Sequence, residues 1–310
     1  MRIVFFGSPA AALPSLERLL ADGHSVELVI TQPDKPAGRG RSLMACPVAR
    51  FAREKGLAVH QPERVRRDPR SLELLQAIRP DIGVVVAFGQ ILPSEVIDLP
   101  KWHTVNVHFS LLPKYRGASP VSWALLRGET RTGVTIFELN EKMDEGGILS
   151  FRELDILPRE NAGQLETRLA RTGAELLSET LATRPRLSLV PQDHAAATSA
   201  PKLKKEDGRL VWTEPAEAVD RKVRAFTPRP SAYAFLAGRR IQFIQGKPLD
   251  ERAGSGSPGL VLSSGPDGIR TCCGQETVYL LEKVKPESRA EMSAAEFGRG
   301  RRWTAGERWE

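Results

Sequence analysis

The N-terminal stretch that decides the fold is RIVFFGSPAAALPSLERLLADGHSVELVIT, residues 2–31. Its two apolar runs, residues 2–6 and 25–31, have the length and residue types of buried strands. Between them, residues 9–20 carry apolar side chains at helical spacing and begin with a proline, which is favoured in the first helical turn. A strand, a helix and a second strand in this order predict two parallel strands joined by a crossover helix.

The same alternation continues along the first half of the chain. Further strand-like runs are residues 58–61, 82–88, 104–109 and 134–139, and helical patterns lie at 47–54, 71–78 and 120–126. A longer amphipathic helix follows, with Leu165, Leu169, Leu176, Leu177 and Leu181 near the helical repeat. This pattern predicts an α/β domain whose Rossmann-like, mostly parallel sheet has helices on both faces.

The C-terminal part of the chain has a different pattern. Residues 187–207 are rich in Pro, Ala, Ser and Lys without a clean period, which is typical of a linker. After it we expect one short helix at 216–226 and then strands separated by turns such as residues 265–268, which predict a small, OB-like β-barrel. We therefore expect a catalytic domain at 1–190, a linker at 191–208 and a C-terminal domain at 209–310.

Composition restricts the expected cellular compartment but does not by itself decide the partner. The 310 residues include three cysteines, too few for a disulfide framework, which fits a reducing environment. With no signal-peptide pattern or membrane-length apolar run, a cytoplasmic location is expected. The formal net charge of +7 arises mainly after residue 200. Such a basic surface is equally consistent with an acidic partner and with simple solubility.

The turn after the first predicted strand argues against a nicotinamide dehydrogenase. A dinucleotide site needs Gly-x-Gly-x-x-Gly at this point so that the backbone can approach a pyrophosphate. Residues 6–9, Phe-Gly-Ser-Pro, contain a single glycine and are explained by a tight turn with Pro9 at the start of a helix.

Two polar residues share one face of the predicted strand at 104–109. Alternation places Val105 and Val107 on one face and Asn106 and His108 on the other. A histidine alone would more often be a core residue bonded to a backbone carbonyl, but asparagine is depleted in strands. Because both precede the loop at a strand's carboxyl end, where open α/β sheets bind ligands, we interpret them as site residues.

Asp144 adds a third polar group, after the strand at 134–139 and before Gly146 and Gly147. By itself it is typical of a turn. With Asn106 and His108 it completes the requirements for acyl transfer to an amine. Asn106 can donate to an oxyanion, His108 can carry a proton, and Asp144 can orient the imidazole or accept the amine's proton. No base-paired Ser or Cys nucleophile is evident, so we expect direct transfer, and we assign no metal ligands.

The runs SLLPKYRGASP at 110–120 and GVTI at 133–136, after Asn-x-His, resemble the folate-dependent formyltransferase family. The resemblance implies 10-formyltetrahydrofolate as formyl donor and Asn106, His108 and Asp144 as catalytic residues. It also implies two folate-contacting segments. Their residues are Ser110, Leu111, Leu112 and Pro113, and Phe88, Gly89, Gln90, Ile91 and Leu92.

Residues 31–41, TQPDKPAGRGR, resemble the loop with which some members of this family enter the acceptor arm of initiator tRNA. Its prolines, glycines and cations suit contact with phosphates, although a solvated surface loop has the same composition. Residues 201–203 and 224–230 resemble the tRNA-contacting domain of the same members. The implied partners are folate and initiator methionyl-tRNA, with no obligatory protein partner. The implied tRNA-binding residues are Lys35, Arg39, Arg41, Lys202, Lys204 and Lys205.

Two departures from the family pattern and three rival functions remain at this point. Gly147 stands where many members have a second acid, and Arg229 stands where they often have tryptophan. The first alternative is formylation of a small amine such as an amino-sugar nucleotide, which would need no basic loop or barrel. The others are folate hydrolysis and RNA binding without catalysis, and the intact Asn106, His108 and Asp144 argue against the last.

Overall fold

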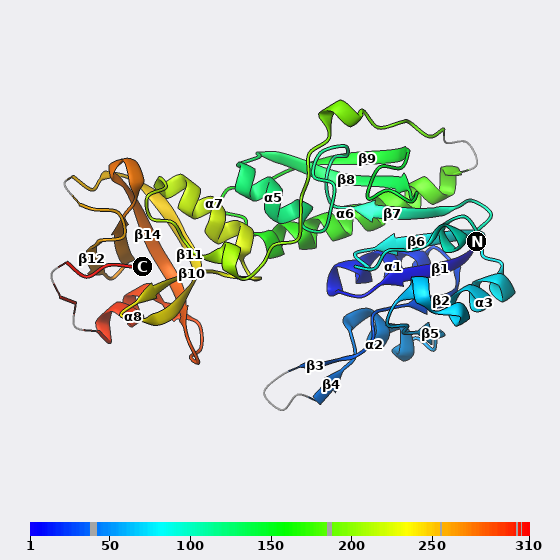
Figure 1. The fold of residues 1–310 in the computed structure, drawn as a ribbon, viewed down its shortest axis with the longest axis horizontal. Helices are drawn as coiled ribbons and strands as arrows, with labels where there is room; N and C mark the ends of the chain where they lie inside the picture. Colours follow the sequence, from blue (N-terminus) through cyan, green and yellow to red (C-terminus); the bar gives the residue numbers. More distant parts are fainter. Residues whose placement is uncertain (38–41, 185–187, 255, 302, 305) are drawn as a thin grey trace. The chain divides into compact units, whose positions relative to one another are not determined.

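The computed structural model describes residues 1–37, 42–184, 188–254, 256–301, 303–304 and 306–310 (Figure 1). The chain forms two compact units. Unit 1 comprises Met1–Pro120, Arg131–Asp155 and Glu166–Pro201, and unit 2 comprises Val121–Thr130, Ile156–Leu165 and Lys202–Glu310. The expected domain limits at 1–190, 191–208 and 209–310 stay a prediction.

Unit 1 is built on a seven-stranded sheet with the order β5-β2-β1-β6-β7-β8-β9. The first five strands in this order are parallel, and β8 and β9 run antiparallel to their neighbours. The predicted mostly parallel sheet is confirmed. Its strands are β1 (Arg2–Gly7), β2 (Ser25–Ile30), β5 (Val59–His60), β6 (Ile82–Val86), β7 (Thr104–His108), β8 (Arg131–Glu138) and β9 (Ile148–Asp155).

Helices cover both faces of this sheet (Figure 1). On one face α3 and α4 contribute Leu75 and Val96 to an apolar core shared with Phe6 and Val85. On the other face α6 lies so close that a Cβ on Gly173 would stand 2.8 Å from Val107. No helix of the described ranges is long and apolar enough to cross a membrane. The helices before residue 201 are α1 (Leu13–Ala21), α2 (Pro47–Glu54), α3 (Pro69–Ile78), α4 (Ser94–Ile97), α5 (Pro120–Arg127) and α6 (Ala162–Thr183).

Three details of unit 1 differ from the sequence-based expectations. Strand β9 was not predicted, because it is an edge strand that carries no apolar run and buries only Leu149 fully. The stretch at 31–41, expected as a loop, contains β3 (Lys35–Ala37), which pairs with β4 (Ser42–Met44) in an antiparallel ribbon. The helix expected at 9–20 begins as a 3₁₀ turn at Ala10–Ala12 and becomes α-helical only in α1.

Unit 2 contains the predicted helix, α7 (Ala216–Phe226), and an antiparallel sheet of order β10-β11-β14-β13-β12, with β15 on β14. The remaining elements are β10 (Ala232–Leu236), β11 (Arg239–Arg252), β12 (Val261–Gly265), β13 (Gly268–Cys272), β14 (Thr277–Pro286), β15 (Met292–Ser293) and α8 (Ala294–Arg299). The C-terminus connects the two edges of this sheet. Trp309 donates to the carbonyl of Gly259, next to β12, and Glu310 exchanges two backbone hydrogen bonds with Phe235 of β10.

The interior of unit 2 contains an aromatic cluster. Trp212, Phe243 and Trp309 lie with ring centroids 5.0 to 6.4 Å apart. The Trp309 indole N–H also donates to Thr271 Oγ1 at 3.0 Å, so the penultimate residue is held by packing and by a buried hydrogen bond.

Candidate active site

Strand β7 presents two polar side chains from the middle of the sheet. It lies between β6 and β8, and Asn106 pairs with Val85 on one side and Phe137 on the other. Because side chains alternate, Val107 packs toward α6 while Asn106 and His108 occupy the opposite face. The His108 ring is buried and meets Phe137 edge-on, with centroids 6.3 Å apart.

The hydrogen bond of the His108 ring determines which nitrogen is available. Nε2 lies 2.9 Å from the carbonyl oxygen of Tyr115. A carbonyl oxygen can only accept, so Nε2 carries a hydrogen. In the neutral ring Nδ1 then has a free lone pair, and this nitrogen faces Asp144 Oδ2 at 3.8 Å.

The loop between β8 and β9 folds back over β7 and brings Asp144 to this position. The Asp144 side chain is 12% exposed, and its Oδ2 accepts a hydrogen bond of 2.7 Å from the backbone N–H of Gly117. The residue has a φ of 54°, in the left-handed region, where aspartate is more common than most residues. Gly146 allows the close return of the loop, because a Cβ there would lie 1.7 Å from the carbonyl oxygen of Glu138.

The side chains of Asn106, His108 and Asp144 leave both hydrogen-bond donors and hydrogen-bond acceptors free for a substrate. Nδ1 of neutral His108 and the Asp144 carboxylate are both acceptors, and at 3.8 Å they are not bonded to each other. A donor placed beside them, such as a substrate ammonium group, can therefore reach both. The Asn106 amide has no partner among the described residues, so its N–H groups are available to a developing oxyanion. The arrangement suits removal of a proton from an amine and stabilisation of a tetrahedral intermediate.

The predicted folate loop at 110–113 is held by its own polar groups and by Thr135 of β8. Ser110 Oγ donates to the carbonyl of Lys114 at 2.7 Å. Thr135 Oγ1 donates to the Ser110 carbonyl at 2.7 Å and accepts from the Leu112 N–H at 3.1 Å. Leu111 packs where Gly133 has no side chain, and the peptide bond before Pro113 is cis. Thr135 was not assigned a role from the sequence, although it belongs to the GVTI run.

In the second predicted folate segment, residues 88–92, some side chains lie in the core and others lie at the surface. Phe88 and Leu92 belong to the apolar core of unit 1. The Gln90 amide is engaged by its neighbours, accepting from the Val65 N–H at 2.9 Å and donating to the Pro62 carbonyl at 3.2 Å. A cavity of about 570 Å³ lies at this segment. Its lining comprises Gln32, Pro33, Glu63, Arg64, Arg66, Gly89, Gln90 and Ile91.

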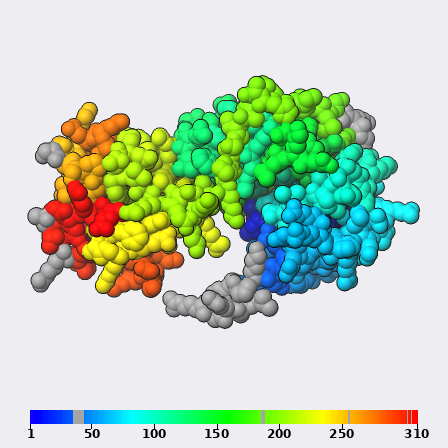
Figure 2. All heavy atoms as spheres, in the orientation of Figure 1, coloured from blue at the N-terminus to red at the C-terminus, as the bar shows by residue number. Residues whose placement is uncertain are grey.

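Residues 190–201, expected as part of a linker, run along unit 1 beside the site (Figures 1 and 2). Arg116 makes two backbone hydrogen bonds to this segment, donating to Thr198 at 2.8 Å and accepting from Ala200 at 2.7 Å. The side chain of Gln192 contacts both Arg116 and the backbone of Asp144. The sequence offered no signal for Gln192, because the segment has neither strand nor helix periodicity.

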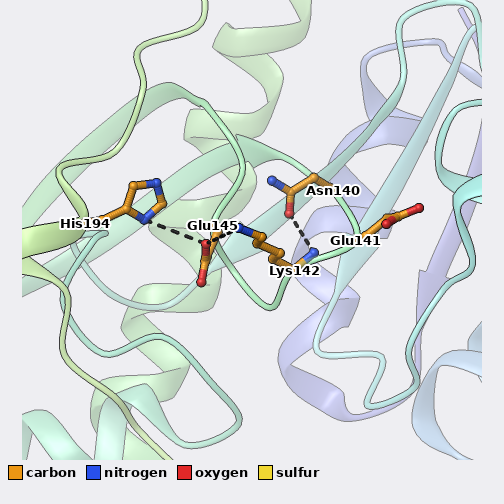
Figure 3. A pocket seen from close by; sticks show the side chains of 5 residues that line it. All are labelled: Asn140, Glu141, Lys142, Glu145 and His194. Carbon is orange, nitrogen blue, oxygen red and sulfur yellow. Dashed lines mark hydrogen bonds and ion pairs between the residues drawn. The ribbon is translucent and has the colours of Figure 1, made fainter.

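A second cavity, of about 310 Å³, borders the loop that carries Asp144 (Figure 3). Its lining residues are Asn140, Glu141, Lys142, Glu145 and His194. The Glu145 carboxylate lies within 4 Å of the cationic groups of Arg116 and Lys142, and of the His194 ring. These contacts connect residues 140–145 to the segment after residue 190.

Gly147, where the family pattern often has an acid, lies against Leu189, just before this segment. A Cβ at this position would stand 3.1 Å from Cβ of Leu189. Leu189 therefore occupies the direction in which the absent carboxylate would point. No group of three His, Cys, Asp or Glu side chains suited to a metal occurs in the part of the chain that is described.

The predicted tRNA-contacting residues are only partly visible. Lys202, Lys204 and Lys205 are exposed at the beginning of unit 2. Arg39 and Arg41 lie outside the described residues, as does the side chain of Lys35. Their roles stay predictions.

Comparison with known proteins identifies relatives of the whole chain. The family profile Formyl transferase matches residues 1–181, and the profile Formyl transferase, C-terminal domain matches residues 202–302. A methionyl-tRNA formyltransferase of Solibacter usitatus is 44% identical over 310 residues, covering 99% of this chain and 98% of the relative. One of Chloroflexus aggregans is 45% identical over 300 residues, covering 95% and 96%.

Among solved structures, the N-formyltransferase from Helicobacter canadensis in complex with folinic acid and dTDP-3-aminofucose has a TM-score of 0.64. The two chains are 16% identical, and the match covers 90% of this chain and 98% of the other. At this identity the similarity shows a shared fold.

Proposed function

This chain belongs to the formyl transferase family, and from that premise we propose that it transfers the formyl group of 10-formyltetrahydrofolate to the amino group of methionine on initiator methionyl-tRNA. The observation that carries the chemistry is the pair of unbonded acceptors, His108 Nδ1 and the Asp144 carboxylate, beside the available amide of Asn106. The choice of acceptor rests on relatives that are 44–45% identical over almost the full chain and bear this name.

The first step is deprotonation of the methionine ammonium group, because only a neutral amine is nucleophilic. The ammonium group donates to His108 Nδ1 and Asp144, and His108 Nδ1 takes its proton. Nε2 keeps its hydrogen bond to Tyr115, so the ring becomes an imidazolium without changing its orientation. Asp144 then stabilises that positive charge across the 3.8 Å separation.

The amine nitrogen next bonds to the formyl carbon, and the carbonyl oxygen becomes an oxyanion. Asn106 donates a hydrogen bond to this oxygen, and the imidazolium adds positive charge nearby. As the intermediate collapses, the bond from carbon to the folate N10 breaks, the proton held on His108 passes to N10, and the attacking nitrogen loses its second proton to solvent through Asp144. The products are formylmethionyl-tRNA and tetrahydrofolate.

The folate is proposed to lie against the backbone of residues 110–113 and the segment 88–92. We propose different roles for the residues within each segment. Ser110 Oγ is used inside its loop, and Phe88 and Leu92 are core residues, so these three act by shaping the segments. Gly89 and Ile91 lie at the cavity surface, where contact with a ligand is possible.

The tRNA is proposed to be held by cationic side chains in both units. The lysines at 202, 204 and 205 have exposed side chains that suit phosphate contacts. Lys35, Arg39 and Arg41 are proposed as a second set, from the basic loop recognised in the sequence.

The decisive experiment offers two amines to the purified protein with 10-formyltetrahydrofolate. Formyl transfer to initiator methionyl-tRNA, with little or none to a dTDP-linked amino sugar, supports the proposal. The reverse preference would replace it with small-amine formylation, and release of formate alone would indicate a hydrolase.

Asp144→Asn tests the chemical role in the same assay, with Asp98→Asn at an exposed carboxylate as matched control. We expect Asp144→Asn to lower kcat much more than it weakens binding of a folate analogue. Equal losses in both quantities would make Asp144 a binding residue instead.

A further inference from the structure

Gln192 is a buried amide in an otherwise exposed segment. From 191 to 200 only Gln192 and Ala200 are buried, and Gln192 is 6% exposed. Burying a polar side chain is costly unless its hydrogen bonds are made, so its partners indicate what it is for.

Both N–H hydrogens and both acceptor positions of the Gln192 amide are used in hydrogen bonds. Nε2 donates to the carbonyl oxygens of Asp144 at 2.9 Å and Gly146 at 2.8 Å. Oε1 accepts from Arg116, at 3.1 Å from Nε and 2.7 Å from Nη2. One side chain therefore ties the catalytic loop to the loop that follows β7.

Asp144 needs such support because its backbone is in the left-handed region. This region is strained for a non-glycine residue, which persists there only when its surroundings hold it. Gln192 binds the carbonyl of that same residue. The carboxylate at the other end of Asp144 is held by the N–H of Gly117, which follows the Arg116 that Gln192 also binds.

We infer that Gln192 is a positioning residue that holds the Asp144 carboxylate beside His108 without touching the substrate. The inference rests on the proposed function, since it assigns Gln192 to the proton-accepting pair of that reaction. The alternative is that Gln192 only fastens the segment at 190–201 to Arg116, in which case its donors to the catalytic loop are incidental.

Two substitutions separate these roles. Gln192→Glu keeps an oxygen acceptor for Arg116 but places a carboxylate oxygen against two carbonyl oxygens. Gln192→Leu removes every hydrogen bond. Gln76 is an exposed glutamine on α3, so Gln76→Glu and Gln76→Leu are matched controls.

We expect both Gln192 variants to lower kcat for formyl transfer by about ten- to a hundredfold, since a 1 Å misplacement of a catalytic group costs on the order of a hundredfold. The KM values for folate and tRNA should change less than kcat, and the pH profile of kcat should shift because the geometry of His108 and Asp144 changes. Active sites are counted by stoichiometric binding of a folate analogue, so that loss of folded protein is not mistaken for loss of rate.

A fastening role predicts a different result. Gln192→Glu would then have the wild-type kcat and pH profile per active site, and only Gln192→Leu would be less stable to urea. That outcome overturns the inference.

Hydrogen exchange of residues 140–147 provides a readout that does not depend on activity. Faster exchange in Gln192→Glu than in wild type, with Gln76→Glu unchanged, is expected, and equal exchange in all three would also overturn the inference. If Gln192→Leu fails to fold, Gln192→Met, which has a similar length and no branching, replaces it. If the wild type formylates no acceptor, the proposed function fails, while this exchange comparison still decides whether Gln192 holds the loop.

Discussion

Thr135 offers the sharpest test of how the sheet holds the loop at 110–113. Its hydroxyl is fully buried, and it bonds the Ser110 carbonyl at 2.7 Å and the Leu112 N–H at 3.1 Å. Thr135→Val keeps the shape but leaves both backbone groups without a partner, at about 1–3 kcal/mol each. We therefore expect the free energy of unfolding to fall by at least about 2 kcal/mol.

Thr135→Ser is the matched variant, because it keeps the hydroxyl and loses one methyl group, at a cost of about 1 kcal/mol. Urea unfolding followed by circular dichroism measures both variants. Hydrogen exchange of a peptide spanning residues 109–115 should show the Leu112 amide exposed in Thr135→Val alone. Loss of the two hydrogen bonds should make Val the more damaging replacement. If packing rather than hydrogen bonding mattered, Ser would be worse and Val nearly neutral, and that order would refute the assigned role of the Thr135 hydroxyl.

Three further predictions concern rate, tRNA binding and thiol reactivity. Asn106→Ala and His108→Ala should each lower kcat, by roughly a hundredfold to a thousandfold for an oxyanion donor, with unchanged circular dichroism; near-wild-type turnover in either would end the proposed mechanism. Replacing the exposed Lys202, Lys204 and Lys205 with alanine should weaken tRNA binding and reduce the slope of log affinity against log salt concentration by about 2. Arginine at the same positions should preserve this slope. Equal slopes for all forms would remove these residues from the tRNA site. Burial raises the pKa of the Cys273 thiol to about 12, so it stays protonated and unreactive at pH 8. An alkylating reagent should then label the half-buried Cys46 in the folded protein and all three thiols after denaturation, as mass spectrometry of peptides will show.

Local pattern was sufficient for most of the fold. Apolar runs predicted the central strands, leucine spacing predicted α6, and helical patterns predicted α2 and α7, because each of these segments buries one face or both. The pattern did not show β9, which is an edge strand with a single buried side chain, or α8, which has only six residues. Such short or exposed elements depend on their neighbours more than on their own periodicity.

For the candidate site, the sequence by itself was enough to predict which residues carry the chemistry. Asn106 and His108 share a face because a strand alternates, and that relation is local. Two other relations required the tertiary structure. The carbonyl of Tyr115 selects the available nitrogen of His108, and Gln192 ties residues 144 and 146 to Arg116. Gln192 lies 48 residues after Asp144 in a segment without periodicity, and its hydrogen bonds are directed to backbone carbonyls, which every residue possesses. Partners of that kind leave no mark in a sequence, so only the folded chain could reveal them.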